Sequence, residues 1–215
     1  RVWDFKQNYG NENLIRVANT PKYFIIVMGP PASGKSTSTK HVLSALSIEN
    51  EPVLNVIVDD IVASFPHYQT EIAKVKSTLE MISSHHHGAI TNITQGERNT
   101  ICHLSESIYF SYRSWADQKS NSMVLEEFLE PIKHRHIIYE TTGSDMAYDW
   151  ANRIAYMASQ NGYIPIVQYF HAPFSILQQR ALKRALHDGR LICDDGLKHI
   201  AMQSQNNFIH LLHTL

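Results

Sequence analysis

The stretch that decides the fold reads Tyr23-Phe24-Ile25-Ile26-Val27-Met28-Gly29-Pro30-Pro31-Ala32-Ser33-Gly34-Lys35-Ser36-Thr37. Its first six residues are apolar without polar alternation, which is typical of a parallel strand covered by helices on both faces. The residues that follow have the spacing of glycine, four residues and Gly-Lys-Ser, and a helix-like stretch comes next. A strand, a glycine-rich turn and a helix in this order predict a phosphate-binding loop.

The residue types of this loop suit an anionic ligand. Glycines let main-chain N–H groups turn inward, and the positive end of the following helix favours phosphate there. We expect Lys35 to reach the β- and γ-phosphates of a nucleoside triphosphate, Ser36 to ligate Mg²⁺ and Thr37 to bond the α-phosphate. ATP is the expected donor, with GTP as the alternative. The predicted nucleotide-binding residues are Gly29, Pro30, Pro31, Ala32, Ser33, Gly34, Lys35, Ser36 and Thr37.

Strand-like and helix-like stretches alternate along the rest of the chain. Further strands are predicted over 53–58, 136–139 and 163–170. Helices are predicted over 35–46, 68–83, 106–130 with a break near Asn121, 146–160, 174–187 and 197–212. This alternation predicts a three-layer α/β domain with a mainly parallel sheet, as in P-loop NTPase-like proteins. No fifth strand is expected before Leu215.

Length and composition are those of one folded domain. The chain has 215 residues, 43% of them hydrophobic and 18% charged, and no linker-like or repeated segment divides it. We expect an N-terminal extension over 1–20 and one domain over 21–215, with an inserted helical region over about 84–130. Because the chain opens with Arg1, it is expected to be part of a longer chain or assembly.

Charge, hydropathy and cysteines bear on partners and location. With 19 Lys and Arg against 20 Asp and Glu, the formal net charge is −1, which disfavours nucleic acid as a partner. The longest apolar run is far shorter than the roughly 20 residues that cross a bilayer, so no membrane segment is expected. Cys102 and Cys193 stand far apart in the sequence, which predicts neither a disulfide framework nor a zinc site. A reducing, cytoplasmic location is therefore expected.

Two adjacent carboxylates follow the second predicted strand. Ligands of parallel α/β sheets bind beside the carboxyl ends of the strands, so Asp59 and Asp60 are expected near the γ-phosphate. One of them could accept the proton of an attacking hydroxyl, or hold Mg²⁺ through water. Because neighbouring side chains at a strand end point to opposite sides, at most one faces the substrate. The alternative is that they cap the helix that follows.

A polar turn, Glu140-Thr141-Thr142-Gly143-Ser144-Asp145, follows the third predicted strand. Glu140 could hold the water shell of Mg²⁺ or a substrate hydroxyl, and the turn offers hydroxyl and amide groups to a ligand. The alternative is a turn in which Ser144 or Asp145 caps the next helix.

A basic stripe marks the predicted helix over 174–187. The side chains that share one helix face, at i, i+3, i+4 and i+7, are Arg180, Lys183, Arg184 and His187. Arg190 follows in the next loop. Such a helix and loop could form a lid whose guanidinium groups stabilise charge on a transferred phosphoryl group. A solvated basic face is the alternative.

Together these motifs resemble the zeta toxin family of phosphate-loop kinases, which is related to nucleoside-monophosphate kinases and chloramphenicol phosphotransferase. The resemblance covers roughly residues 23–212. In that family an acidic residue stands seven positions before a proline, and an aromatic follows two positions after it; this spacing selects Asp59 before Pro66 and Tyr68. The resemblance implies that Asp59 is the catalytic base and Asp60 its neighbour.

The resemblance extends to the substrate site and the lid. It implies that Glu140 and Thr142 lie on the substrate-binding turn, and we include Asp60 with them as a predicted substrate-binding residue. The implied phosphate-contacting lid residues are Arg180 and Arg190, with Arg184 as an additional candidate. The family's usual acceptor is UDP-N-acetylglucosamine.

The chain departs from the family pattern at two places. Ser144 stands where the family's turn continues with arginine, which removes a substrate contact. The stretch between the second and third strands is longer than in the family, and Glu126 and Glu127 are the nearest candidates for its acidic substrate-binding helix residue.

Other residues invite a functional interpretation. The histidines at 85–87 and the pair Cys102-His103 suggest a metal. Three consecutive histidines cannot converge on one ion from a regular element, and no Cys-x-x-Cys or His-Glu-x-x-His motif accompanies them, so a surface loop is expected. The basic cluster over 133–136 is expected to be a solvated turn. Aromatic residues that could stack a base or sugar, with core packing as the alternative, gather near Arg113 at Tyr109, Phe110, Tyr112 and Trp115.

The predicted function is transfer of the γ-phosphate of ATP to a hydroxyl of a small metabolite, for instance a nucleotide sugar. Asp59 would orient the acceptor, Lys35 and Ser36 with Mg²⁺ would hold the donor, and the arginines would neutralise charge in the transition state. Two alternatives stay open. One is a polynucleotide 5′-hydroxyl kinase, and the other is a non-catalytic nucleotide-binding module of a larger assembly.

Overall fold

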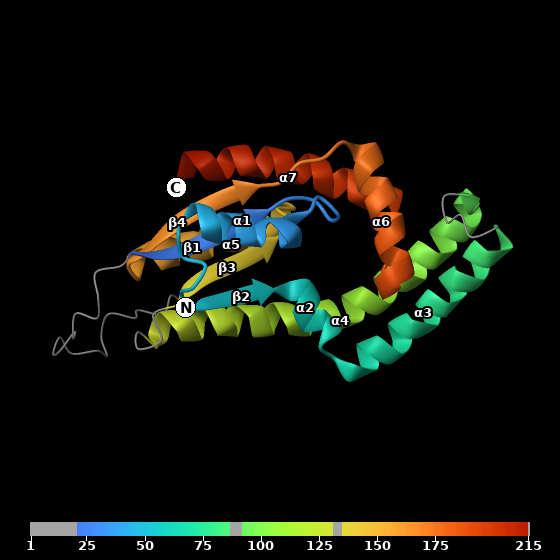
Figure 1. Cartoon of the computed structure of the whole chain (residues 1–215), viewed down its shortest axis with the longest axis horizontal. Helices are drawn as coiled ribbons and strands as arrows, with labels where there is room; N and C mark the ends of the chain where they lie inside the picture. Colours follow the sequence, from blue (N-terminus) through green and yellow to red (C-terminus); the bar gives the residue numbers. More distant parts are fainter. Residues whose placement is uncertain (1–20, 87–91, 131–134, 215) are drawn as a thin grey trace.

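The computed structural model describes residues 21–86, 92–130 and 135–214. The predicted N-terminal extension over 1–20 lies outside the described residues. Figure 1 shows the order of the elements along the described chain.

A four-stranded parallel sheet lies at the centre of the molecule. Its strands, in the spatial order β2-β3-β1-β4, are β1 (Lys22–Met28), β2 (Val53–Ile57), β3 (His136–Thr141) and β4 (Tyr163–Tyr169). Residues 24–28 of β1 are fully buried between the neighbouring strands and the helices, as their unbroken apolar run predicts. Among the described residues no strand follows β4, which agrees with the expected absence of a fifth strand.

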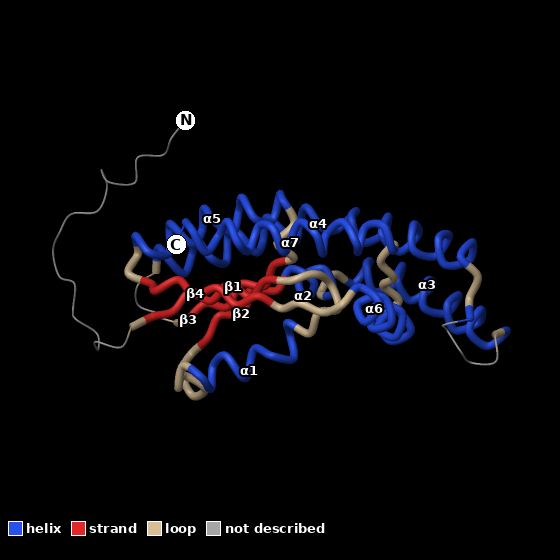
Figure 2. Tube along the Cα trace, turned by 90° about the horizontal axis from the view of Figure 1, so that it is seen from above, coloured by secondary structure: helices blue, strands red, loops and turns tan. Residues whose placement is uncertain are grey.

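Helices cover both faces of this sheet, so the predicted three-layer α/β architecture is confirmed. Figure 2 shows α1 (Lys35–Ala45) on one face and α4 (Gln95–Leu129), α5 (Asp145–Gln160) and α7 (Asp194–Thr214) on the other. The α1 face has its own core, in which Val42 packs against Ile25 and Val27. On the opposite face, Ile154 of α5 and Leu211 of α7 belong to the core beneath the sheet.

The long helix α4 differs from its prediction at two points. It begins at Gln95, because Thr94 and Glu97 form a capping box in which each side chain accepts the other's main-chain N–H. It also continues to Leu129 without the break predicted near Asn121. The predicted break is wrong because the buried face continues through this region, with fully buried side chains at Ala116, Ser120 and Val124.

A second core lies beyond the carboxyl ends of the strands. It is formed where α2 (Val58–Ala63), α3 (Pro66–His85), α4 and α6 (Phe174–Asp188) pack together. Figure 1 shows α3 and the first half of α4 extending beyond the sheet. Val58 was predicted to end a strand, but it begins α2, where its side chain is buried in this helical core. The second core therefore brings α4 and α6 to the edge of the sheet at which the phosphate-binding loop is predicted.

Cys102 on α4 and Cys193 between α6 and α7 form a disulfide, with their Cα atoms 5.3 Å apart. The expectation that these cysteines stay unpaired is wrong. They are 91 residues apart in sequence, but the chain returns to α4 after α6 and brings them together. The sequence separation of the two cysteines gives no sign of this tertiary contact. The cysteines therefore give no support to a reducing location.

Among the described residues, no helix combines the length and the apolar character that a membrane-spanning segment requires.

Candidate active site

The predicted phosphate-binding loop has the expected place between β1 and α1. Its backbone bends sharply, with positive φ angles at Ala32 (63°) and Gly34 (100°). At Gly29 a Cβ atom would lie 2.5 Å from the carbonyl oxygen of Phe170, so only glycine fits beside this neighbour. The loop therefore has the tight turns that a phosphate cradle requires.

Lys35 and Ser36 contact an acidic side chain from the neighbouring strand. Lys35 Nζ lies 3.8 Å from Glu140 Oε1, and it donates hydrogen bonds to the carbonyl oxygens of Gly29 at 2.8 Å and Pro30 at 3.0 Å. The Ser36 hydroxyl donates to Glu140 Oε2 at 3.1 Å. Burial raises the pKa of Glu140, although the positive charge of Lys35 acts in the opposite direction. Burial lowers the pKa of Lys35, and the negative charge of Glu140 partly opposes this shift.

This pair of oxygen ligands fits a magnesium ion. Mg²⁺ is held by one or two protein oxygens together with phosphate and water ligands. The Ser36 hydroxyl and the Glu140 carboxylate are oxygens of this kind, and they lie together where the loop meets the end of β3. Ser36 and Glu140 are therefore the residues that would hold Mg²⁺.

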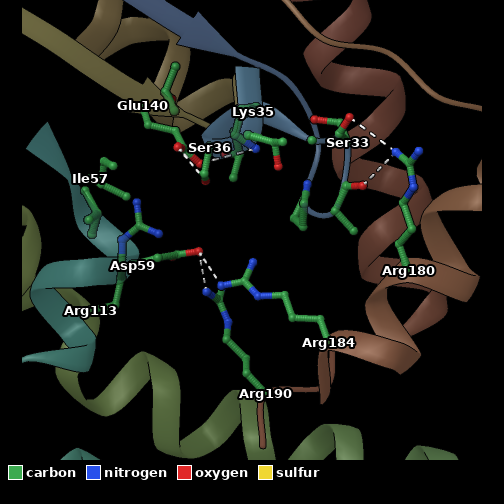
Figure 3. A pocket seen from close by; sticks show the side chains of 17 residues that line it. Ser33, Lys35, Ser36, Ile57, Asp59, Arg113, Glu140, Arg180, Arg184 and Arg190 are labelled. Atoms are coloured by element: carbon green, nitrogen blue, oxygen red, sulfur yellow. Dashed lines mark hydrogen bonds and ion pairs between the residues drawn. The ribbon is translucent and has the colours of Figure 1, made fainter. Parts of the chain in front are cut away.

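A pocket of about 650 Å³ opens above the loop (Figure 3). Its lining residues are Pro31, Ala32, Ser33, Gly34, Lys35, Ser36, Thr37, Ile57, Val58, Asp59, Arg113, Glu140, Thr141, Thr142, Arg180, Arg184 and Arg190. All five residues predicted to be catalytic are among them, and so are Glu140 and Thr142. The lining includes five basic and two acidic side chains, so the pocket has a positive charge that the near-neutral whole chain conceals.

Asp59 faces this pocket from the first turn of α2. Its carboxylate Oδ2 lies 2.6 Å from Arg190 Nη1 and 3.6 Å from Arg184 Nη2, and its Oδ1 accepts a hydrogen bond from the Tyr109 hydroxyl at 2.7 Å. Burial opposes ionisation, but the charge and hydrogen bond of Arg190 and the Tyr109 hydroxyl hold the pKa of Asp59 well below its usual range. The carboxylate is therefore ionised at any physiological pH.

Asp60 does not share this position. It is exposed and does not line the pocket, because consecutive side chains of a helix point about 100° apart. The structure therefore gives Asp60 no place in the pocket lining, and its substrate contact stays a prediction. The capping alternative is not observed either, since α2 has Ile57 at its N-cap and no side-chain capping bond.

Two side chains of α4 complete the surroundings of Asp59. Tyr109 is buried, and the guanidinium carbon of Arg190 lies 3.5 Å above its ring centroid, as in a cation–π contact. Burial raises the pKa of Tyr109 to about 12, so the phenol stays protonated and its hydroxyl donates a hydrogen bond to Asp59. Arg113 donates from Nη1 to the Tyr109 oxygen at 2.6 Å and from Nε to Asp117 Oδ1 at 2.8 Å.

Sequence reasoning singled out Tyr109 and Arg113 only for stacking or core packing. The available signal was their spacing, because Tyr109, Arg113 and Asp117 are four residues apart and share a helix face. The neighbouring aromatics differ: Phe110 and Trp115 are exposed, at 63% and 64% of their surface.

The predicted lid is helix α6 with the loop after it, and its arginines approach the pocket from the side opposite the sheet (Figure 3). Arg180 Nη1 lies 3.5 Å from the carbonyl oxygens of Ala32 and Ser33 in the loop. Lys183 and His187, from the same predicted stripe, are exposed and do not line the pocket. The solvated-face alternative thus applies to these two residues and not to the arginines.

The turn after β3 is used partly as predicted. Thr142 lines the pocket, and its hydroxyl oxygen lies 3.2 Å from that of Ser144, which does not line it. Ser144 occupies the N-cap position of α5 without a side-chain capping bond. Asp145 accepts a hydrogen bond from Asn207 of α7 at 2.9 Å, so it ties α5 to α7.

Several other candidates have structural roles away from the pocket. Glu127, proposed as a substrate-binding residue, is buried and accepts from Arg135 Nε at 2.8 Å at the amino end of β3. His136, predicted to lie in a solvated turn, is fully buried with Nε2 2.9 Å from Glu51 Oε2. His86 lies at the end of α3 with Nε2 3.2 Å from Glu97 Oε2, and the rest of the histidine and basic clusters, at 87 and 133–134, lies outside the described residues.

Fold and pocket together define an α/β domain of the P-loop NTPase type. The order β2-β3-β1-β4 reverses beside β1, and the loop lies at the carboxyl end of that strand, where such sheets bind ligands.

Of the comparisons with known proteins, one with a solved structure agrees with this fold. No family model matches the chain. The uncharacterized protein L872 of Acanthamoeba polyphaga mimivirus is 29% identical over 192 residues, which cover 86% of this chain and 55% of that protein. A chain in the structure of the Pnkp1/Rnl/Hen1 RNA repair complex superposes with a TM-score of 0.50 at 14% identity, over 93% of this chain and 49% of that one. The chain thus spans about half the length of both proteins.

Proposed function

We propose that the protein is a phosphotransferase that moves the γ-phosphate of a nucleoside triphosphate to a hydroxyl group, with the 5′-hydroxyl of a polynucleotide as the favoured acceptor. One observation carries the proposal: an ionised carboxylate, Asp59, faces the same pocket as the phosphate loop, with arginines between them. A simple nucleotide-binding module has no need of this carboxylate.

The donor is held by the loop. Main-chain N–H groups around Gly34 and the ammonium group of Lys35 bind the β- and γ-phosphates. Ser36 and Glu140 hold Mg²⁺, which when bound neutralises charge on the phosphate oxygens. Thr37 contacts the α-phosphate from the first turn of α1.

The acceptor hydroxyl is oriented by Asp59. Phosphoryl transfer passes through a loose transition state, so a weakly basic carboxylate can position the hydroxyl and take its proton late. Arg184 and Arg190 contact Asp59 in the structure, and phosphate oxygens compete for the same guanidinium groups. Donor binding therefore frees the carboxylate for the acceptor and directs the arginines to the transferred group.

The choice of acceptor rests on the charge of the pocket and on the fold comparison. The five basic side chains of the pocket carry more charge than the carboxylates of Asp59 and Glu140 neutralise. One of them, Arg113 of α4, lies beside Asp59, on the side away from Arg180 (Figure 3). A phosphate next to the acceptor hydroxyl would find a partner there. The similarity to a chain of an RNA repair complex points the same way.

A small metabolite is the second candidate acceptor. A volume of about 650 Å³ is within the range of small-molecule sites, and the zeta toxin resemblance suggests a nucleotide sugar. A polyanionic acceptor has more support, because five of the lining side chains are basic and only two are acidic.

The decisive experiment incubates the protein with Mg²⁺ and γ-labelled ATP or GTP, together with 5′-hydroxyl RNA, 5′-hydroxyl DNA or a metabolite extract. We expect label on the 5′ ends and none on matched oligonucleotides that already carry a 5′-phosphate. Lys35→Ala should abolish transfer, whereas Lys40→Ala, an exposed change on the same helix, should not. Label on a metabolite alone would favour the second acceptor, and transfer to neither would overturn the enzymatic proposal.

A further inference from the structure

A second cluster of ionisable side chains lies outside the pocket, where the segment between α6 and α7 meets α4. Its members are Cys102, His103 and Glu106 of α4 and Cys193 of the facing segment. Their sulfur, nitrogen and oxygen donor atoms lie within 4.8 Å of one another. Nothing in the proposed transfer reaction uses these side chains.

Two of the donor-to-donor distances lie close to those of a tetrahedral metal site. Zinc bonds of about 2.0–2.3 Å place neighbouring donors of a tetrahedron about 3.3–3.8 Å apart. Cys193 Sγ lies 3.1 Å from Glu106 Oε2 and 3.8 Å from His103 Nδ1. The edge between the two sulfur atoms differs, because Cys102 and Cys193 are joined in a disulfide.

The contact between Glu106 Oε2 and the Cys193 sulfur is not explained by the disulfide. A disulfide sulfur has no hydrogen to donate, so the carboxylate oxygen beside Cys193 gains no hydrogen bond from the oxidised pair. A thiol or a bound cation at this position would satisfy it. The other oxygen, Oε1, accepts the main-chain N–H of Cys193 at 3.1 Å, which fixes the orientation of the carboxylate, as outer hydrogen bonds orient metal ligands.

We propose that Cys102, His103, Glu106 and Cys193 bind one Zn²⁺ ion when the disulfide is reduced. Two equivalents of a small thiol reduce the disulfide, yielding two cysteine thiols and one small-molecule disulfide. Zinc binding then displaces the two thiol protons to solvent, and neutral His103 and ionised Glu106 complete the ligand set. Thiolate, imidazole and carboxylate together suit zinc, and exposed His103 gives the ion access.

Either cross-link attaches the end of the lid to α4. Leu191 donates its N–H to Ser105 Oγ at 3.0 Å, and Cys193 is held by Glu106, so the residues directly after Arg190 are fixed on this helix. Zinc would keep this attachment under reducing conditions, in which the disulfide is lost. The site therefore maintains the place of Arg190 in both redox states.

The test uses the whole chain, reduced with a small thiol and then freed of it, with Co²⁺ as a spectroscopic probe for zinc. Reduced protein should show two titratable thiols, bind one Co²⁺ per chain with thiolate charge-transfer absorption, and lose that absorption on adding one equivalent of Zn²⁺. His103→Ala and Glu106→Gln should each weaken binding at least about tenfold. His199→Ala, an exposed change on α7, is the matched control and should bind as the wild type does.

His103→Ala leaves both cysteines in place, so its folding does not depend on a lost cross-link. The proposal is overturned if the disulfide resists millimolar thiol, if reduced protein binds no Co²⁺ through sulfur, or if both ligand variants bind with unchanged affinity. None of these results depends on phosphotransferase activity, so they are independent of the proposed function.

Discussion

Asp59 is surrounded by groups that favour its charge, and this decides how it can act. Arg190 and the Tyr109 hydroxyl bind its two oxygens directly, and Arg184 lies further away. A carboxylate with so low a pKa is a poor proton acceptor before the reaction begins. Its contribution must therefore come from orienting the hydroxyl and from accepting the proton late, when the bond to phosphorus has largely formed.

Replacing this carboxylate by an amide tests that role. Asp59→Asn keeps the shape but removes the charge, so we expect transfer to fall by about 10²–10³-fold while ATP binding persists. Single-turnover transfer and calorimetric titration with ATP measure the two quantities. Asp60→Asn, at the exposed neighbouring position, is the matched control, and a rate near that of the wild type in Asp59→Asn would contradict the role.

The same carboxylate predicts a pH dependence of stability. Because folding lowers the pKa of Asp59, its ion pairs stabilise the protein above the pKa of the unfolded chain, and this stabilisation is lost as the pH falls through the folded value. The difference in unfolding free energy between wild type and Asp59→Asn should stay constant from about pH 7 to 5 and shrink below about pH 4. Urea unfolding at a series of pH values measures it, and a difference that grew on acidification would contradict the assignment.

Arg113 is expected to act on the acceptor and not on the donor. Arg113→Ala should raise the KM for the acceptor about tenfold or more and leave the KM for ATP unchanged, since the guanidinium enters beside Asp59. Steady-state kinetics with each substrate varied in turn separates the two. Lys119→Ala, exposed on the same helix, controls for a loss of charge, and an equal rise in both KM values would speak against the role.

At the residue scale, the sequence predicts what is local. The loop from Gly29 to Thr37 is found by spacing alone, because its ligand contacts come from consecutive residues. Arg180 and Arg184 are found by their shared helix face, and the resemblance adds Arg190. The roles of Tyr109 and Arg113 are not found, since Tyr109 contacts Asp59, 50 residues away, and Arg113 reaches the pocket only after α4 packs against α2.

Helix α4 shows what was predictable at the scale of an element. The sequence predicts a helix over 106–130, but α4 begins at Gln95, where a capping box that the prediction missed starts the helix. The predicted break near Asn121 falls in a stretch of polar residues over 117–122. The structure shows that tertiary packing on both sides of this position overrides their weak helix propensity.

The continuity of α4 can be tested at that position. Asn121→Pro removes one helical hydrogen bond and introduces a clash with the preceding turn, so we expect a loss of about 3 kcal/mol in unfolding free energy. Asn121→Ala should change it by less than about 1 kcal/mol. Urea unfolding measures both, and a proline variant as stable as the alanine variant would show that the helix tolerates a break there.

The pocket lies between the two cores of the molecule. The phosphate loop follows β1 and Glu140 lies in β3 of the sheet, whereas Arg113 and Arg184 come from helices of the second core and Arg190 from the loop after α6. The three layers were predictable because each strand carries its own apolar run. The second core and the disulfide were not, since both depend on how α4 and α6 meet in space.

The placement of charge predicts how a nucleic acid would bind. The basic side chains cluster in one pocket, so a single strand should make about three phosphate contacts, and its affinity should fall with log[salt] with a slope of about −2. Fluorescence anisotropy with 5′-hydroxyl strands at salt concentrations from about 50 mM to about 300 mM measures this slope. A slope several times steeper would require an extended basic groove in place of the pocket.

The length of α4 has a consequence for how this fold can vary. One continuous helix, α4, carries Cys102, Tyr109 and Arg113 in its first part and Val124, which packs in the core of the sheet, in its last part. Each helical position advances by about 1.5 Å and rotates by about 100°, so deleting one residue between Arg113 and Val124 would swing every upstream side chain to a different azimuth. Only insertions or deletions close to whole turns, such as seven residues, would preserve the directions of these side chains. The length of α4 between the pocket and the sheet can therefore not change by single residues.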